Sequence, residues 1–163
     1  MQRPRQSNGN IALVGPVVLT VGSVIVLVAS FRRWLTSGTV GRSSYELLGL
    51  VHRLGFAPSG ASMAAVESWP LMPLLITSGV VAVWWGWRVA GAALSAIGGV
   101  YAGAVGGVVA FAAPSTRGVE LSSAPAATAV GAGVVVIGAL LVVVMPTGRA
   151  AAASRGARPD GPS

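Results

Sequence analysis

Apolar residues gather in long runs that short polar stretches separate. The run Ile11–Ser30 has no charged residue, and as a helix it spans about 30 Å, the hydrocarbon thickness of a bilayer. Residues 71–113 carry one charge, Arg88, and form about twice that length as one helix, so we expect a turn at the Trp-rich residues 84–88. The pattern predicts an all-α integral membrane four-helix bundle with spans at 11–30, 70–87, 89–113 and 126–145.

A secretory signal peptide is the alternative reading of the first run. Residues 28–30 resemble a cleavage site, although the apolar core of a signal peptide is only about 7–15 residues long. The first run exceeds that length, and we therefore expect a retained helix.

The segment 31–69 is the largest polar part of the chain. It opens with Arg32, Arg33 and Trp34, a charged and aromatic edge typical of the head-group region. Ser43 and Glu46 fit a capping box, in which each side chain bonds the other residue's amide, and this predicts a short amphipathic helix at about 44–54. Residues 114–125 are expected to form a second loop, 1–10 a polar tail, and 146–163 a disordered tail rich in Arg, Ala, Gly and Pro.

The segment 31–69 allows two interpretations. It can be a connector whose short helix caps the bundle, or a docking surface for another protein or for lipid head groups. Arg, Tyr and Trp dominate binding hot spots, so the natural contacts would be Trp34, Arg42, Tyr45 and Arg53.

Small residues recur every four positions in the third span. Such a row lies along one helix face and lets neighbouring helices approach closely. We expect it to pack against the other spans of the same chain or, alternatively, to form an oligomer or partner interface. The row comprises Gly91, Ser95, Gly99, Gly103 and Gly107.

Composition supports a membrane protein and weakens other classes. Of the 163 residues, 53% are hydrophobic and 9% charged, against about 25% charged in soluble domains. The net charge of +7 comes from arginines scattered through tails and loops, which argues against nucleic-acid binding. Six arginines fall on the side of both tails and five on the other, a bias that places both tails in the cytoplasm.

Residues able to carry chemistry are few. The chain has no cysteine, one histidine (His52) and four acidic residues that do not cluster, so we expect no metal, cofactor or catalytic residues and no enzyme activity. The spans contain no ionisable side chain, which argues against a proton or ion path within one chain. A passive pore built from several subunits is the alternative that a glycine face permits.

The layout of four spans, a longer first loop, a Trp-rich hairpin and an Arg/Ala-rich tail is similar to that of small actinobacterial four-pass membrane proteins. One such group, of unknown function, is encoded beside tryptophan-biosynthesis genes, and it implies no established activity. We therefore expect a plasma-membrane protein without catalysis, an accessory or scaffold subunit of a cell-envelope assembly. The alternative function is a subunit of a transporter or oligomeric pore.

Overall fold

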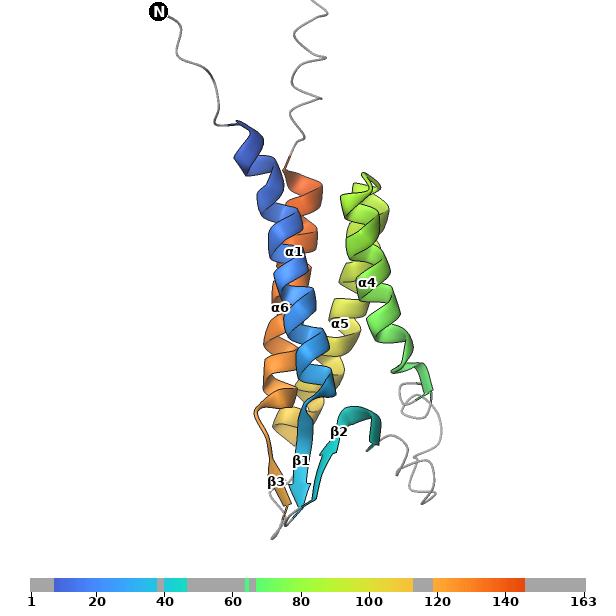
Figure 1. Ribbon diagram of the computed structural model, residues 1–163, viewed down its shortest axis with the longest axis vertical. Coiled ribbons are helices and arrows are strands. Elements are labelled where there is room, and N and C mark those ends of the chain that lie inside the picture. Colours follow the sequence, from blue (N-terminus) through green and yellow to red (C-terminus); the bar gives the residue numbers. More distant parts are fainter. Residues whose placement is uncertain (1–7, 38–39, 47–63, 65–66, 113–118, 146–163) are drawn as a thin grey trace, which may run out of the picture.

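The computed structural model describes residues 8–37, 40–46, 64, 67–112 and 119–145. Its main elements are apolar helices that run along one long axis (Figure 1). Three of them are long and apolar enough to cross a membrane, whereas the fourth, α4, is a shorter apolar helix of 14 residues. The helices are α1 (Asn8–Phe31), α4 (Leu71–Trp84), α5 (Arg88–Ala112) and α6 (Ala124–Val144).

The most extensive contacts are those of α6 with α1 and α5 and of α5 with α4, and α4 also touches α1. Glycines make the contact of α1 with α6 unusually close. A Cβ atom on Gly22 would lie 2.6 Å from the backbone nitrogen of Val135, and one on Gly15 would lie 2.8 Å from that of Val142. Gly138 approaches the backbone of Leu19 in the same way from the α6 side. Backbones that come this close gain dispersion contacts, which are the main source of helix association in lipid.

The small-residue row on α5 divides between two neighbours. Gly91 lies against Gly79 and Val83 of α4, and the Ser95 hydroxyl donates to the carbonyl of Ile76 at 3.4 Å. Further along, a Cβ on Gly99 would meet Val135 of α6 at 2.9 Å. A four-residue step turns about 40° past a full helical turn, so the row winds around α5 from one partner to the other.

The remaining members of the row complete this pattern. A Cβ on Gly103 would meet Ala132 of α6 at 3.1 Å, whereas a Cβ on Gly107 would have no atom within 4 Å. The close contacts observed for the row are thus made inside the chain, and a role of the row in an oligomer stays a prediction.

A small antiparallel sheet occupies segments that we expected to be loops, and it corrects the expectation of helices alone. Its strands are β1 (Arg33–Ser37), β2 (Val40–Ser43) and β3 (Val119–Leu121), in the order β2-β1-β3. Thr36 of β1 lies opposite Gly41 on one side and Glu120 on the other. Strands of three to five residues have no clear alternation of apolar and polar positions, and β3 is brought to β1 only by the helices between them.

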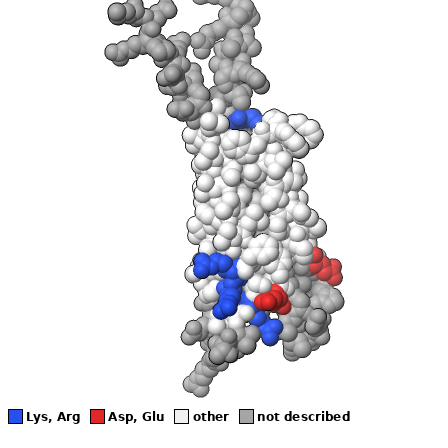
Figure 2. All heavy atoms as spheres, in the orientation of Figure 1, with Lys and Arg blue, Asp and Glu red and all other residues white. Residues whose placement is uncertain are grey.

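Charged side chains mark the two ends of the molecule. Figure 2 shows an uncharged belt between them, with one basic patch at the end where α1 starts and several basic and acidic side chains at the sheet end. The start of α1, the end of α6 and the turn between α4 and α5 share the first end (Figure 1). The tails 1–7 and 146–163, most of the predicted helix at 44–54, and Arg53 lie outside the described residues.

The turn between α4 and α5 depends on Gly86, which has a φ of 101°, a conformation that favours glycine. Arg88 follows, and its side chain does not simply extend into solvent. Its half-buried guanidinium donates to the carbonyls of Val142 at 2.9 Å and Met145 at 3.4 Å. These carbonyls belong to the C-terminal end of α6, where a cation is favourable because the helix dipole is negative there.

Candidate functional site

Five aromatic side chains hold the sheet end of the molecule together, and we call them the aromatic cluster. The Phe31 and Tyr45 rings stack with centroids 5.0 Å apart, and the Trp34 and Trp69 rings meet edge to face at 5.6 Å. Trp69 also contacts Tyr101 of α5 at 5.8 Å. The first contact thus links the end of α1 to the turn after β2, and the other two link β1 to the segment before α4 and that segment to the middle of α5. Such pairs add about 0.5–1.5 kcal/mol each beyond the burial of their surface.

Two side chains satisfy carbonyl groups at the end of α1. The Trp34 indole nitrogen donates to the Ala29 carbonyl at 3.0 Å, and the Ser44 hydroxyl donates to the Ser30 carbonyl at 2.6 Å. The last carbonyls of a helix have no partner within it, so these bonds complete α1 where it leaves the apolar belt. They also attach β1 and the residues after β2 to the helix.

The predicted capping box is present. The Ser43 amide donates to the Glu46 carboxylate at 2.8 Å, and the Glu46 amide donates to the Ser43 hydroxyl at 3.4 Å. Residues 44–46 are helical, so β2 passes directly into a helical turn. We use the name cap for this structure as a whole: the three strands, residues 44–46 and the aromatic cluster.

Two buried polar atoms in the cap have no hydrogen-bond partner among the described residues, the Tyr45 hydroxyl and the Trp69 indole nitrogen. Burial raises the pKa of Tyr45 above its ordinary value of 10.0, and the nearby Ser30 hydroxyl opposes this pKa shift in part. That Ser30 hydroxyl donates its proton to the Leu27 carbonyl at 2.8 Å. The protein interior therefore favours the neutral phenol of Tyr45.

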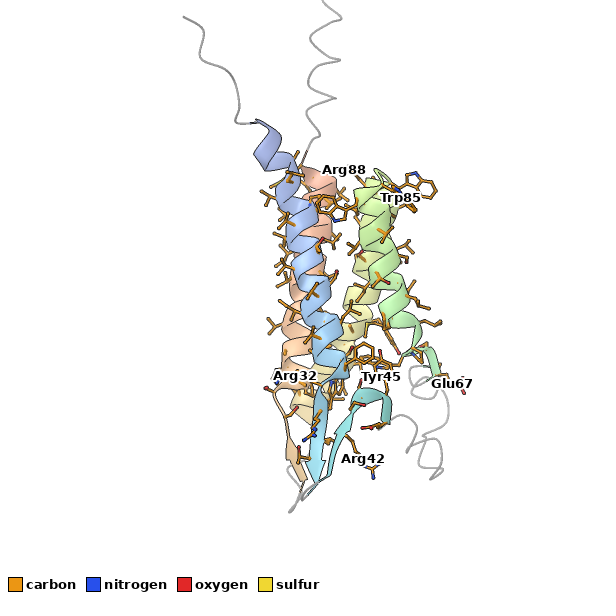
Figure 3. The ribbon with its side chains drawn as sticks, in the orientation of Figure 1. Arg32, Arg42, Tyr45, Glu67, Trp85 and Arg88 are labelled. Carbon is orange, nitrogen blue, oxygen red and sulfur yellow. The ribbon has the colours of Figure 1, made fainter. Side chains whose placement is uncertain are left out.

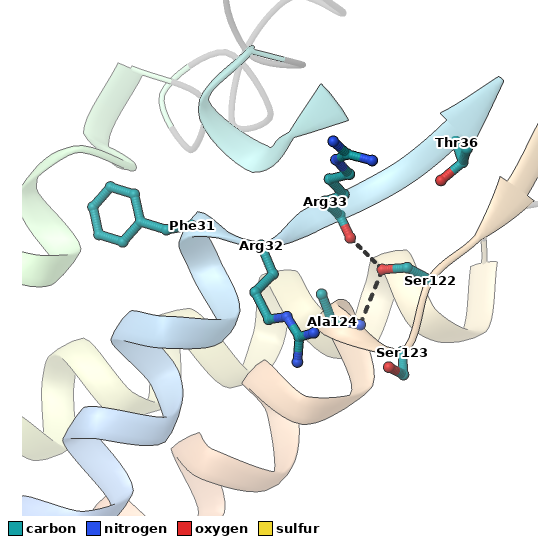
Figure 4. A pocket seen from close by; sticks show the side chains of 7 residues that line it. All are labelled: Phe31, Arg32, Arg33, Thr36, Ser122, Ser123 and Ala124. Carbon is teal, nitrogen blue, oxygen red and sulfur yellow. Dashed lines mark hydrogen bonds between the residues drawn. The ribbon is translucent and has the colours of Figure 1, made fainter. Parts of the chain in front are cut away.

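A cleft of about 550 Å³ opens beside β1, where α1 ends and α6 begins (Figure 4). The Ser122 hydroxyl forms one of its walls, because it donates to the Arg33 carbonyl and accepts the Ala124 amide at 3.1 Å. We call this the basic cleft. Its lining consists of Phe31, Arg32, Arg33, Thr36, Ser122, Ser123 and Ala124.

The contact residues that the sequence indicated have different surroundings. Trp34 is only 3% exposed, and its ring is used within the cap. Tyr45 is half-buried, and Arg42 is exposed on β2, where Figure 3 shows it pointing away from the helices. Arg53 lies outside the described residues.

The sequence indicated only some of the residues that line the cleft. Arg32 and Arg33 stand out as a charged edge after an apolar run, but nothing in the sequence pairs them with Ser122 and Ser123. That pairing depends on the sheet, which brings residues about 90 positions apart together.

Across the described part of the chain, no group of three or more His, Cys, Asp or Glu side chains is placed to hold a metal ion. No protein-family model matches the chain, and no curated protein or solved structure matches it either.

Proposed function

We propose that the chain is a four-pass plasma-membrane protein without catalysis, and that it acts as an accessory or scaffold subunit of a cell-envelope assembly. The observation that carries this proposal is the cap. A plain connector between two helices needs no sheet, capping box or aromatic cluster, whereas a surface that must keep its shape for a partner is supported by all three.

The proposal takes α4 as a fourth crossing although it has only 14 residues. These residues rise about 21 Å, less than the 30 Å of hydrocarbon. The tryptophans at its end can make up part of the difference, because amphipathic rings settle at the interface and the bilayer thins around a short span. Trp85 and Trp87 are 83% and 74% exposed and lie where α4 turns into α5.

In the proposed orientation, both tails and the Trp-rich turn are cytoplasmic and the cap is external. The arginine count favours this side, and the arrangement in Figure 1 puts the start of α1 and the end of α6 at the same end. The cap then presents Arg42 outward, at the end of the molecule that carries several basic and acidic side chains. A rim of exposed charge around a rigid aromatic base is a common design of protein-binding surfaces.

The experiment is site-specific photo-crosslinking of the full-length chain in its native membrane. A photoreactive amino acid replaces Arg42 on the cap, and a matched control replaces Val130, which is 67% exposed in the apolar belt. We expect position 42 to crosslink to an unlike protein and position 130 to give no adduct with that protein. A ladder of self-crosslinked chains from position 42 would favour the oligomeric pore, and the absence of any protein adduct there would contradict the scaffold role.

A further inference from the structure

The basic cleft has one guanidinium directed into it. Figure 4 shows Arg32 extending from the end of α1 toward Ala124 at the start of α6. The neighbouring Arg33 contributes its backbone carbonyl to the wall, while its side chain points the other way and lies over Gly41 of β2. The two adjacent arginines therefore differ in direction, and only Arg32 faces the hollow.

Residues with hydroxyl groups line the same cleft as Arg32. Ser123 lines the cleft and makes no side-chain capping bond to α6, which begins at the next residue. Thr36 of β1 lines the same hollow. The positive end of the α6 dipole adds to the field of the guanidinium, so negative charge is favourable here. Planar Arg forks bind the oxygens of phosphate groups with two parallel hydrogen bonds, and hydroxyls supply further donors.

Two acidic residues of the described part, Glu46 and Glu67, do not pair with Arg32. The Glu46 carboxylate accepts the Ser43 amide, and Figure 3 places Glu67 on the opposite side of the molecule from Arg32. Arg32 faces a hollow with hydroxyls and can therefore donate to an anion, while Glu120 of β3 is paired with Thr36 across the sheet.

The level of the cleft along the helices indicates which anion it binds. Phe31 is 65% exposed and continues the apolar surface of α1, and Arg32 is the next residue. In Figure 2 the basic side chains at this end begin where the uncharged belt stops. In a bilayer, this level holds the phosphodiester groups of the lipids, with their acyl chains beside the belt.

We propose that the basic cleft binds the phosphodiester head group of an anionic membrane lipid, with Arg32 and the Ser123 hydroxyl as its donors. The lipid's acyl chains then lie along the apolar surface of α1 that leads up to Phe31. This inference depends on membrane insertion, which is part of the proposed function, but it does not depend on the scaffold role. Lipid binding and partner crosslinking are separate measurements, so either proposal can fail alone.

Native mass spectrometry of the full-length chain in mild detergent tests the site, with phosphatidylglycerol as the probe and phosphatidylcholine as the neutral comparison. We expect Arg32→Gln to weaken phosphatidylglycerol binding about tenfold, as loss of a bidentate charge-assisted contact does. Arg33→Gln and Arg42→Gln remove the same charge elsewhere on this end, and we expect both to bind like the wild type. Ser123→Val keeps every charge and the start of α6, and should weaken binding about threefold.

Circular dichroism shows that each variant is folded before its binding is compared. Equal weakening by Arg32→Gln, Arg33→Gln and Arg42→Gln would overturn the proposal, because it would show a general effect of net charge. Equal binding of phosphatidylcholine would also overturn it. Displacement of phosphatidylglycerol by excess inorganic phosphate would assign the cleft to a soluble phosphate and would overturn the lipid assignment.

Discussion

Hydrogen bonds from single side chains close helix ends at both ends of this molecule. Trp34 and Ser44 donate to the last carbonyls of α1, and Arg88 donates to the last carbonyls of α6. Each bond joins a helix end to another element, so the same contact that satisfies a polar group also fixes the position of a neighbour.

Tyr45 gives a prediction at the residue scale. Its buried hydroxyl has no hydrogen-bond partner among the described residues, and an unsatisfied buried polar group costs about 1–3 kcal/mol. We therefore expect Tyr45→Phe to leave the free energy of unfolding unchanged or to raise it by about 1 kcal/mol at pH 8. Thermal unfolding in detergent measures this, and clear destabilisation would show that the hydroxyl makes a necessary bond.

The same substitution predicts a pH dependence. In the unfolded chain Tyr45 loses its proton near pH 10.0, whereas burial raises its pKa in the folded chain. Between these two pKa values the folded state holds more protons, so the Tyr45 contribution to stability is complete below pH 10 and is lost as the pH rises above it. The wild type should thus lose more stability than Tyr45→Phe between pH 8 and pH 11. Equal losses of stability in the two proteins would show that the Tyr45 hydroxyl is exposed to water.

Close contact between α1 and α6 is the main feature at the scale of elements. Two glycines of α6 serve as test and control positions. Gly138 lies against the backbone of Leu19, whereas a Cβ on Gly133 would have no atom within 4 Å. We expect Gly138→Ala to destabilise the fold by about 1–3 kcal/mol, since the backbones must separate. Gly133→Ala should change stability by less than about 1 kcal/mol, in the favourable direction.

Unfolding of both variants in detergent compares them directly. If the two substitutions have the same effect, the close approach of α1 and α6 is not what stabilises the bundle. If only Gly133→Ala lost stability, α1 would have to contact the face of α6 that carries Gly133.

The sequence predicted the apolar helices better than the structure between them. Long uncharged runs identify α1, α5 and α6, and the capping box at Ser43 and Glu46 depends on spacing alone. The sheet could not be predicted, because its strands are short and because α4 and α5 separate β3 from β1 in the sequence. The basic cleft depends on the pairing of β1 with β3, so the sequence could not predict that Ser122 and Ser123 line it.

At the scale of the whole molecule, the distribution of charge is the organising feature. An uncharged belt separates a sheet-bearing end from an end that holds the turn at Gly86 and the start of α1. Side-chain hydrogen bonds such as that from the Trp84 indole nitrogen to the Thr20 hydroxyl, at 3.2 Å, cross between helices that otherwise touch little. We propose that the belt lies within lipid and that the cap lies in water.

Cysteine labelling tests this claim most directly, because the chain has no cysteine of its own. Arg42→Cys marks the cap, Trp85→Cys marks the turn after α4, and Val130→Cys marks the belt. In sealed vesicles, a membrane-impermeant maleimide should label positions 42 and 85 from opposite sides, and position 130 only after denaturation. Labelling of positions 42 and 85 from the same side, or of position 130 in the native protein, would contradict the account.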